Sequence, residues 1–306
     1  MKKIICAMAI GGAVALAGGA SATELWDVQL PGVTEGLANG VIPPPGVYGV
    51  WNSYWASYHV YNSSANQIHG TNLSALVQVP IVLWSTGYKI LGADYAVAIA
   101  QPFDYTSYAP QQNNGHGGGG GNWGLYNTAV IPGQLSWTLG DFHVLTGLTV
   151  WVGDATSSPA VLAGGGWLKG GLPSGNGYWS IQPDLGLSWL HDGWNISAGM
   201  HIAVPVSSTT STNYNYRSGT EYLADYTVTK TIGKWTVGVG AYQVNQFNSD
   251  TNNGHDVHNI AARFGLGPIV GYQFGGINIQ ATVNQSVYTR NDVGGTFANV
   301  RFIVPF

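Results

Sequence analysis

The feature that most constrains this chain is a strict alternation of apolar and polar residues over long stretches. In residues 276–288, Ile277, Ile279, Ala281 and Val283 share one face of an extended chain, and polar residues occupy the other. A period of two residues is typical of β-strands. Ordinary strands have about five or six residues, whereas tilted membrane-spanning strands need about 9–11. The run is therefore long enough for a membrane strand, although a half-buried soluble sheet could show the same pattern.

The alternation recurs, and twelve such segments can be counted along the chain. Tight turns are expected at residues 85–87, 139–141, 191–193, 232–234 and 274–276. Longer polar connections are expected at about 60–70, 103–122, 154–177, 206–219, 248–257 and 289–295. Short and long connections thus alternate, as in outer-membrane barrels with tight periplasmic turns and long extracellular loops. The sequence predicts an all-β transmembrane antiparallel up-and-down β-barrel of about 12 strands.

In such a barrel the apolar face of each strand meets lipid and the polar face lines the lumen. The pattern therefore places the apolar residues of 73–83, among them Leu73, Val77 and Val79, on the outside. Closure pairs every backbone group, as a strand in lipid requires. Twelve strands enclose a lumen wider than that of a filled eight-stranded barrel and narrower than that of a porin.

Composition agrees with a surface that is not covered by water. The chain is 8% charged, against about 25% in soluble globular proteins. After the first 20 residues there is no apolar run of about 18 residues, which excludes a transmembrane helix bundle. The abundant aromatic residues argue against disorder.

The amino terminus has the pattern of a secretory signal peptide. Lys2 and Lys3 precede an apolar stretch, and residues 20–22 are a small-residue cleavage pattern, so residues 1–22 are predicted to be removed. The remainder would carry 8 basic and 14 acidic residues, a net charge of −6, which argues against a nucleic-acid partner. Residues 23–46 form a periplasmic N-terminal segment that could plug the lumen or lie outside it, and residues 47–306 form the barrel. We expect an outer-membrane location in a Gram-negative bacterium.

Aromatic residues gather near the predicted strand ends, as the interfacial girdle of a membrane protein requires. Examples are Trp84, Trp194 and Trp235. The chain ends on Phe306, with apolar residues alternating before it. This ending resembles the carboxy-terminal signal by which the barrel-assembly machinery recognises outer-membrane proteins. Because the outward face needs only lipid, we expect a monomer.

Charged residues on the polar faces are candidates for the lumen and its constriction, since rings of charge set selectivity in pores. They are Asp94, Asp184, Glu221, Asp225, Arg263 and Arg301, with His143 and His201 nearby. Gly238 and Gly240 on an intervening strand would let Asp225 and Arg263 approach one another. The alternative is a structural ion-pair network that fills the lumen.

Aromatic residues on the same faces could stack against an aromatic solute, at about 0.5–1.5 kcal/mol per ring pair. They are Trp151, Tyr178 and Tyr242, while the face of Tyr54 is ambiguous. Plain packing is the alternative role for these rings.

Other motifs carry little chemistry. His255, Asp256 and His258 lack the further ligands that a metal site needs, and the glycine-rich stretch at 115–121 lacks the ending of a phosphate-binding loop. We predict no metal and no cofactor. An outer-membrane lipid-modifying enzyme would need a serine activated by a histidine, for which Ser136 and His143 are the candidates, but both lie beside a tight turn.

Several stretches together resemble a known family. They are residues 43–48, 135–143, 216–221 and 235–240, then Gln246, Asp250, Gly254 and residues 267–268. Over about residues 30–306 the chain resembles the transporter-like family labelled "MetA-pathway of phenol degradation". The resemblance implies an outer-membrane channel that takes up hydrophobic or aromatic compounds, and it brings no catalytic residues. We therefore expect passive passage of small hydrophobic or aromatic solutes rather than an enzyme. The alternative is a structural or adhesive barrel without an open pore.

Overall fold

A computed structural model describes residues 26–69, 71–110, 120–156, 174–211 and 214–306. The predicted signal peptide at 1–22 lies outside the described residues. Among them, no helix is long and apolar enough to cross a membrane.

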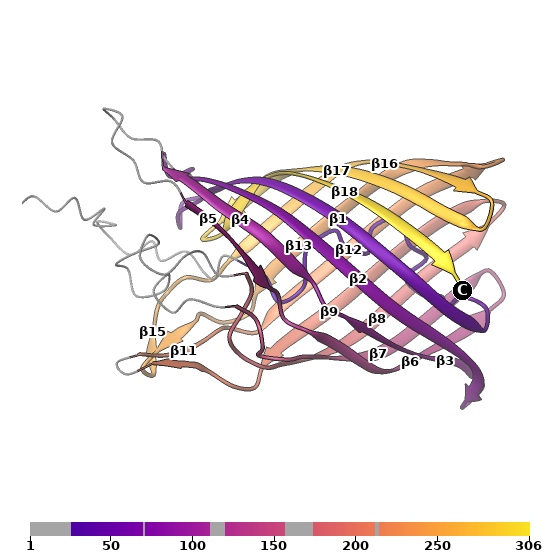
Figure 1. Ribbon diagram of the computed structural model, residues 1–306, viewed down its shortest axis with the longest axis horizontal. Coiled ribbons are helices and arrows are strands. Elements are labelled where there is room, and N and C mark those ends of the chain that lie inside the picture. Colours follow the sequence, from indigo (N-terminus) through magenta and orange to yellow (C-terminus); the bar gives the residue numbers. More distant parts are fainter. Residues whose placement is uncertain (1–25, 70, 111–119, 157–173, 212–213) are drawn as a thin grey trace, which may run out of the picture.

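The described strands form an antiparallel barrel (Figure 1). Its sheet has fourteen strands, of which β4 and β5 are an extension, leaving twelve in the wall. The ring closes because β1 pairs with both β2 and β18. The twelve wall strands are β1 (Gly46–Val60), β2 (Thr71–Ile90), β3 (Ala93–Ala100), β6 (Ala129–Leu139), β7 (Phe142–Trp151), β8 (Ser180–His191), β9 (Trp194–Pro205), β12 (Glu221–Ile232), β13 (Trp235–Gln246), β16 (Ala262–Phe274), β17 (Ile277–Arg290) and β18 (Val293–Pro305). The predicted twelve-stranded barrel is confirmed.

The outer face of the wall is apolar, unlike the surface of a soluble protein. Large apolar side chains such as Leu185, Val239 and Phe302 are exposed on the outside, while Gln182, Asn299 and Arg301 are buried within. Exposed apolar strands and a buried polar interior are the arrangement that a barrel in lipid requires.

Four of the five predicted tight turns are present, and one is misplaced. The chain reverses at Gly140, Gly193, Gly233 and Gly275, all with positive φ. The turn expected at 85–87 is instead a bulge, because Gly87 takes its positive φ (76°) within β2 and the strand continues to Ile90. These turns lie at the same end of the barrel as the carboxy terminus (Figure 1).

At the other end, three predicted loops contain more regular structure than expected. In the range 103–122, β4 (Phe103–Pro110) pairs with β2 and with β5 (Gly120–Leu125), which begins within the predicted loop. A small sheet of β10 (Thr209–Ser211), β11 (Tyr214–Arg217), β14 (Thr251–Asn252) and β15 (His255–Asp256) covers part of this rim. The long connection expected at 289–295 is a two-residue turn, Asn291 and Asp292.

One strand has the opposite orientation to the prediction. On β2, Leu73, Val77 and Val79 are buried inside, whereas Val82 and Trp84 are exposed outside. Both faces of β2 are apolar, so alternation alone could not identify the lipid-facing one. The consequence is an apolar patch of inner wall on this side of the lumen.

Candidate functional site

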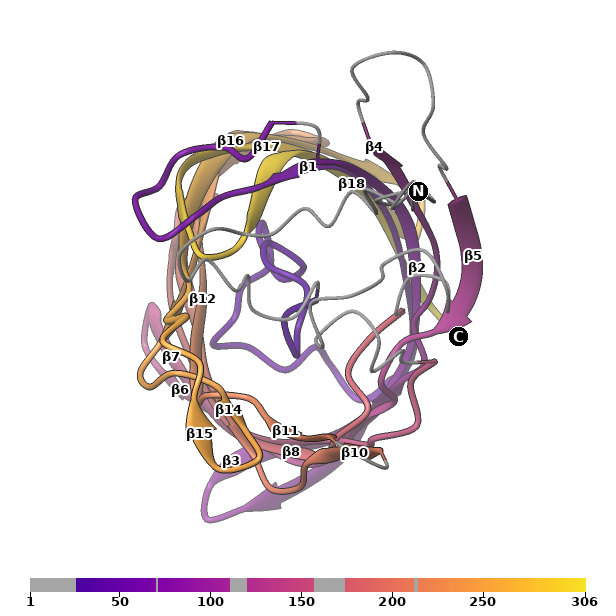
Figure 2. The same cartoon turned by 90° about the vertical axis from the view of Figure 1, so that its left-hand side faces the viewer.

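Residues 26–45, here called the lumenal segment, lie inside the barrel (Figure 2, indigo to violet). Consecutive turns fold them, with backbone N–H groups donating to carbonyls three residues earlier, for example Val33 to Leu30 (3.2 Å) and Leu37 to Thr34 (3.2 Å). Gly32 and Gly36 have φ of 76° and 80°, which side chains rarely adopt. The coiled path leaves other backbone groups free to bond the wall.

Asp225 on β12 is the main acceptor for these groups. Its carboxylate accepts hydrogen bonds from the backbone N–H of Gly32 (2.7 Å) and Thr34 (2.8 Å), and from the Thr34 hydroxyl (2.7 Å). The next inward residue, Thr227, accepts from the N–H of Gly36 (2.7 Å). Hydrogen bonds to a buried charged group are worth about 1.5–3 kcal/mol each, so this strand fixes the segment firmly.

Arg301 on β18 holds the same segment through its carbonyls. It donates to the carbonyl oxygens of Val33 and Glu35 (2.9 Å to the latter), to Gln280 Oε1 (2.7 Å) and to Asn52 Oδ1 (3.0 Å). All three guanidinium nitrogens are engaged, and the side chain is 1% exposed. A buried arginine bonded in this way is a structural clamp with little capacity left for a ligand.

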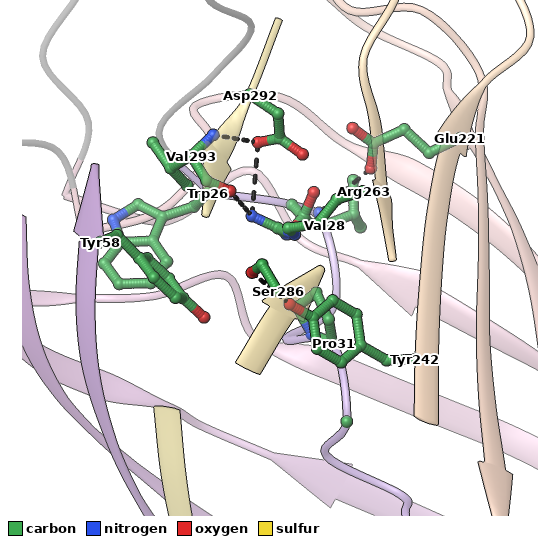
Figure 3. A network of polar contacts seen from close by, with 12 residues as sticks. Trp26, Val28, Pro31, Tyr58, Glu221, Tyr242, Arg263, Ser286, Asp292 and Val293 are labelled. Atoms are coloured by element: carbon green, nitrogen blue, oxygen red, sulfur yellow. Dashed lines mark hydrogen bonds and ion pairs between the residues drawn. The ribbon is translucent and has the colours of Figure 1, made fainter. Parts of the chain in front are cut away.

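Arg263 on β16 is the centre of a second network (Figure 3). It forms ion pairs with Asp27 of the lumenal segment and with Asp292 (3.4 Å), and it donates to the Val293 carbonyl (2.5 Å). The rings of Tyr58 and Tyr242 lie 5.8 and 5.9 Å from its guanidinium. In the same region, Glu221 Oε2 accepts from the N–H of Val28 (3.4 Å).

Glycines in the wall make room for the segment. A Cβ added to Gly186 would lie 1.8 Å from the Asn39 carbonyl oxygen, and one added to Gly240 would lie 2.3 Å from Glu35 Oε2. Gly240 was predicted to let Asp225 approach Arg263, but the Glu35 carboxyl fills that space. Arg263 takes its partners from Asp27 and Asp292 instead.

Acidic groups at this interface have raised pKa values. Burial, with the nearby Asp225 carboxylate, raises the pKa of Glu35 to about 8. Glu35 Oε2 accepts from Asn284 Nδ2 (2.6 Å). Burial also raises the pKa of Asp292 to about 7, against the opposing effect of Arg263. The bound segment therefore favours protonated carboxyl groups.

Asp184 and His201 form a pair on β8 and β9. Asp184 accepts hydrogen bonds from His201 Nδ1 (2.6 Å), Gln182 Nε2 (2.8 Å) and the Thr149 hydroxyl (2.6 Å). Both residues lie on the wall of the cavity described below.

The candidate aromatic residues are buried inside. Trp151 donates its indole N–H to Gln182 Oε1 (2.8 Å), and the Tyr242 hydroxyl bonds Ser286 (2.7 Å). Tyr178 is buried in the main apolar cluster. Tyr54, whose face was ambiguous, points inward and stacks on Phe297 with ring centroids 4.4 Å apart.

Two candidates lie apart from these groups. Asp94 is 45% exposed beside the first tight turn, where it pairs with Lys89 (2.7 Å). The His143 ring contacts the Thr138 hydroxyl (3.2 Å) near the next turn. Among the described residues, no three His, Cys, Asp or Glu side chains are placed to hold a metal ion.

Between the lumenal segment and the apolar patch of wall lies a cavity of about 460 Å³. The segment contributes Leu30, Val33, Leu37 and Val41. The wall contributes mainly apolar side chains, including Val50, Val79, Ile81, Leu83, Ala98, Ile131, Leu145 and Trp151. Polar residues, among them Gln134, Asp184 and His201, occupy one part of the lining. Small-molecule sites commonly have about 300–1,000 Å³ and this mixture of apolar lining with few polar groups.

The sequence reasoning missed Asp27, Glu35 and Gln134. Asp27 and Glu35 lie in a short stretch that also contains Leu30, Val33 and Leu37. That pattern suits a segment with one polar and one apolar side, which was the available signal.

Comparisons with known proteins agree with the fold. The COG4313 outer membrane channel from Pseudomonas putida F1 superposes with a TM-score of 0.74 at 10% identity, covering 88% of this chain and 98% of that chain. The translocator domain of the autotransporter NalP from Neisseria meningitidis gives 0.49 at 10% identity, covering 86% and 90%. No curated protein matches. The family model described as "Putative MetA-pathway of phenol degradation" matches residues 59–302, and the chain belongs to that family.

Proposed function

We propose that this protein is an outer-membrane channel for passive passage of small hydrophobic or aromatic compounds. The observation that supports this proposal is the cavity of about 460 Å³ inside the barrel, which is lined mainly by apolar side chains. An apolar chamber favours a solute that gains from leaving water, at about 25 cal/mol per Å² of buried apolar surface. The Pseudomonas putida protein of similar fold is an outer membrane channel, which supports the same class of function.

In this proposal the lumenal segment is a plug that closes the polar part of the lumen. Its bonds to Asp225 and Arg301 fill the space through which ions would otherwise pass. The protein would reach the outer membrane of a Gram-negative bacterium as a monomer, after loss of residues 1–22 and recognition of Phe306 by the assembly machinery.

The enzymatic alternative has little support from the contacts of its candidate residues. The Ser136 hydroxyl donates to the Gly40 carbonyl (2.7 Å), and the His143 ring contacts Thr138. Neither contact forms the serine–histidine pair that nucleophilic catalysis needs. A structural or adhesive barrel without passage of solutes is the remaining rival.

The test compares uptake of a radiolabelled alkylphenol by cells that carry wild-type protein or one of two variants. Ala98→Phe would fill the cavity from β3 and should reduce uptake to the level of cells without the protein. Ile99→Phe places the same ring on the neighbouring lipid-facing position, which is 50% exposed, and should keep wild-type uptake. Equal uptake with and without the wild-type protein would favour the structural or adhesive role.

A further inference from the structure

Several polar side chains of the cavity have unused hydrogen-bonding capacity, among them Asn39 and His201, whose Nδ2 and Nε2 atoms are buried without a partner. Gln134 on β6 is partly buried and also lines the cavity, and its side-chain amide makes no hydrogen bond to any other residue that the structure describes. A primary amide offers two N–H donors and one carbonyl acceptor. Leaving them unpaired in a mostly apolar chamber is unfavourable unless water or a ligand satisfies them.

Gln134 and Asp184 lie on either side of Gly147, a position without a side chain. Gly147 on β7 pairs with Gln134 on one side and with Asp184 on the other. A Cβ on Gly147 would lie 3.1 Å from Gln134 Cγ and 3.7 Å from Asp184 Cβ. Because Gly147 has no side chain, nothing from that position separates the amide from the Asp184–His201 pair, and both line the same cavity.

The charges near Gly147 argue against an anionic ligand. Asp184 lies beside Gly147, and its carboxylate accepts hydrogen bonds from Thr149, Gln182 and His201. Arg301 also lines the cavity, but its three guanidinium nitrogens are already bonded to Asn52, Gln280 and the lumenal segment. A carboxylate bound at Gln134 would therefore lie beside the like charge of Asp184, and Arg301, which keeps its positive charge, has few N–H groups left to donate to it.

We propose that Gln134 is a specificity-determining residue that binds the hydroxyl group of a neutral apolar alcohol or phenol within the cavity. The hydroxyl donates to Gln134 Oε1 or accepts from Nε2, and the apolar body lies among Val79, Ile81 and Leu145. This inference rests on the proposed function and names the solute class of the same cavity.

The experiment measures binding to the purified full-length protein by isothermal titration calorimetry with three probes that share one apolar body. They are 4-propylphenol, propylbenzene and 4-propylbenzoate. We expect 4-propylphenol to bind most tightly and the benzoate most weakly. Gln134→Leu should weaken 4-propylphenol binding by about three- to tenfold, the value of one hydrogen bond, and change propylbenzene binding by less than about twofold. Comparing variants with one probe keeps partitioning into detergent constant.

Gln273→Leu is the matched control, because this exposed glutamine lies beside the β16–β17 turn and bonds the Gly275 carbonyl (3.0 Å). Unchanged 4-propylphenol binding by the Gln134→Leu protein, or an equal loss for both uncharged probes, would overturn the inference while leaving the cavity intact. If no probe binds the wild-type protein, or if Ala98→Phe binds every probe normally, the proposed function fails as well.

Discussion

Asp225 accepts two hydrogen bonds from Thr34, one from the backbone N–H at 2.8 Å and one from the hydroxyl at 2.7 Å, although 191 residues separate the two in the chain. A third bond comes from the N–H of Gly32. The wall strand β12 thus holds the segment that crosses the lumen, and the strength of these bonds should govern how often the segment leaves its place.

Asp225→Asn should loosen the lumenal segment. The amide has one acceptor oxygen and no charge, so at least one of three charge-assisted bonds weakens, at a cost of about 1.5–3 kcal/mol. We expect a thiol reagent to modify the Leu37→Cys variant at least tenfold faster when Asp225→Asn is also present. The chain has one cysteine, Cys6 in the predicted signal peptide, so the engineered cysteine gives the signal. Asp192→Asn, at an exposed turn, is the control, and equal rates in both would contradict the prediction.

Gly186→Ala should displace the segment by contact rather than by charge. The new methyl group would lie 1.8 Å from the Asn39 carbonyl oxygen, which is far inside van der Waals contact. We expect proteinase K to cleave within residues 26–45 of this variant, as mass spectrometry would detect, while the heat-dependent gel shift of a folded barrel persists. Gly276→Ala serves for comparison, because its Cβ would have nothing closer than 3.8 Å. A protected segment in Gly186→Ala would show that the wall yields instead.

Docking of the segment should weaken as pH rises. Glu35 has its ordinary pKa of 4.5 when the segment is free and a pKa of about 8 when it is bound. Between these values the free form is ionised and the bound form protonated, so docking takes up a proton and loses up to about 1.4 kcal/mol per pH unit. The rate at which the thiol reagent modifies Leu37→Cys should rise from pH 5 to pH 8. The rate of a free thiol at each pH corrects for the change in thiolate concentration. Burial also raises the pKa of Asp27 in the same segment, so Glu35→Gln should flatten the slope without abolishing it. An unchanged slope in Glu35→Gln would exclude Glu35 as the titrating group.

The lipid-facing assignment predicts a depth-dependent cost of charge. Val239→Lys, in the middle of β13 on an exposed side chain, should destabilise the barrel by about 2–4 kcal/mol in denaturant-induced unfolding in lipid bilayers. Ile232→Lys, at the turn end of β12, should cost about 0–1 kcal/mol because it lies near the interface. Equal costs at both positions would mean that Val239 does not face the hydrocarbon core.

The sequence by itself determined the architecture. Period-two alternation is a local property of each strand, and it marked the outward faces around Leu185 and Phe302 and the turns at Gly140 and Gly275. The tertiary structure decided which face of β2 meets lipid, because both faces are apolar and only closure of the ring distinguishes them. It also decided the partners inside the lumen: Asp27 with Arg263, and Glu35 beside Gly240, are separated by more than 200 residues. Alternation shows that such side chains point inward, but the segment that they bind is placed by contacts across the whole barrel.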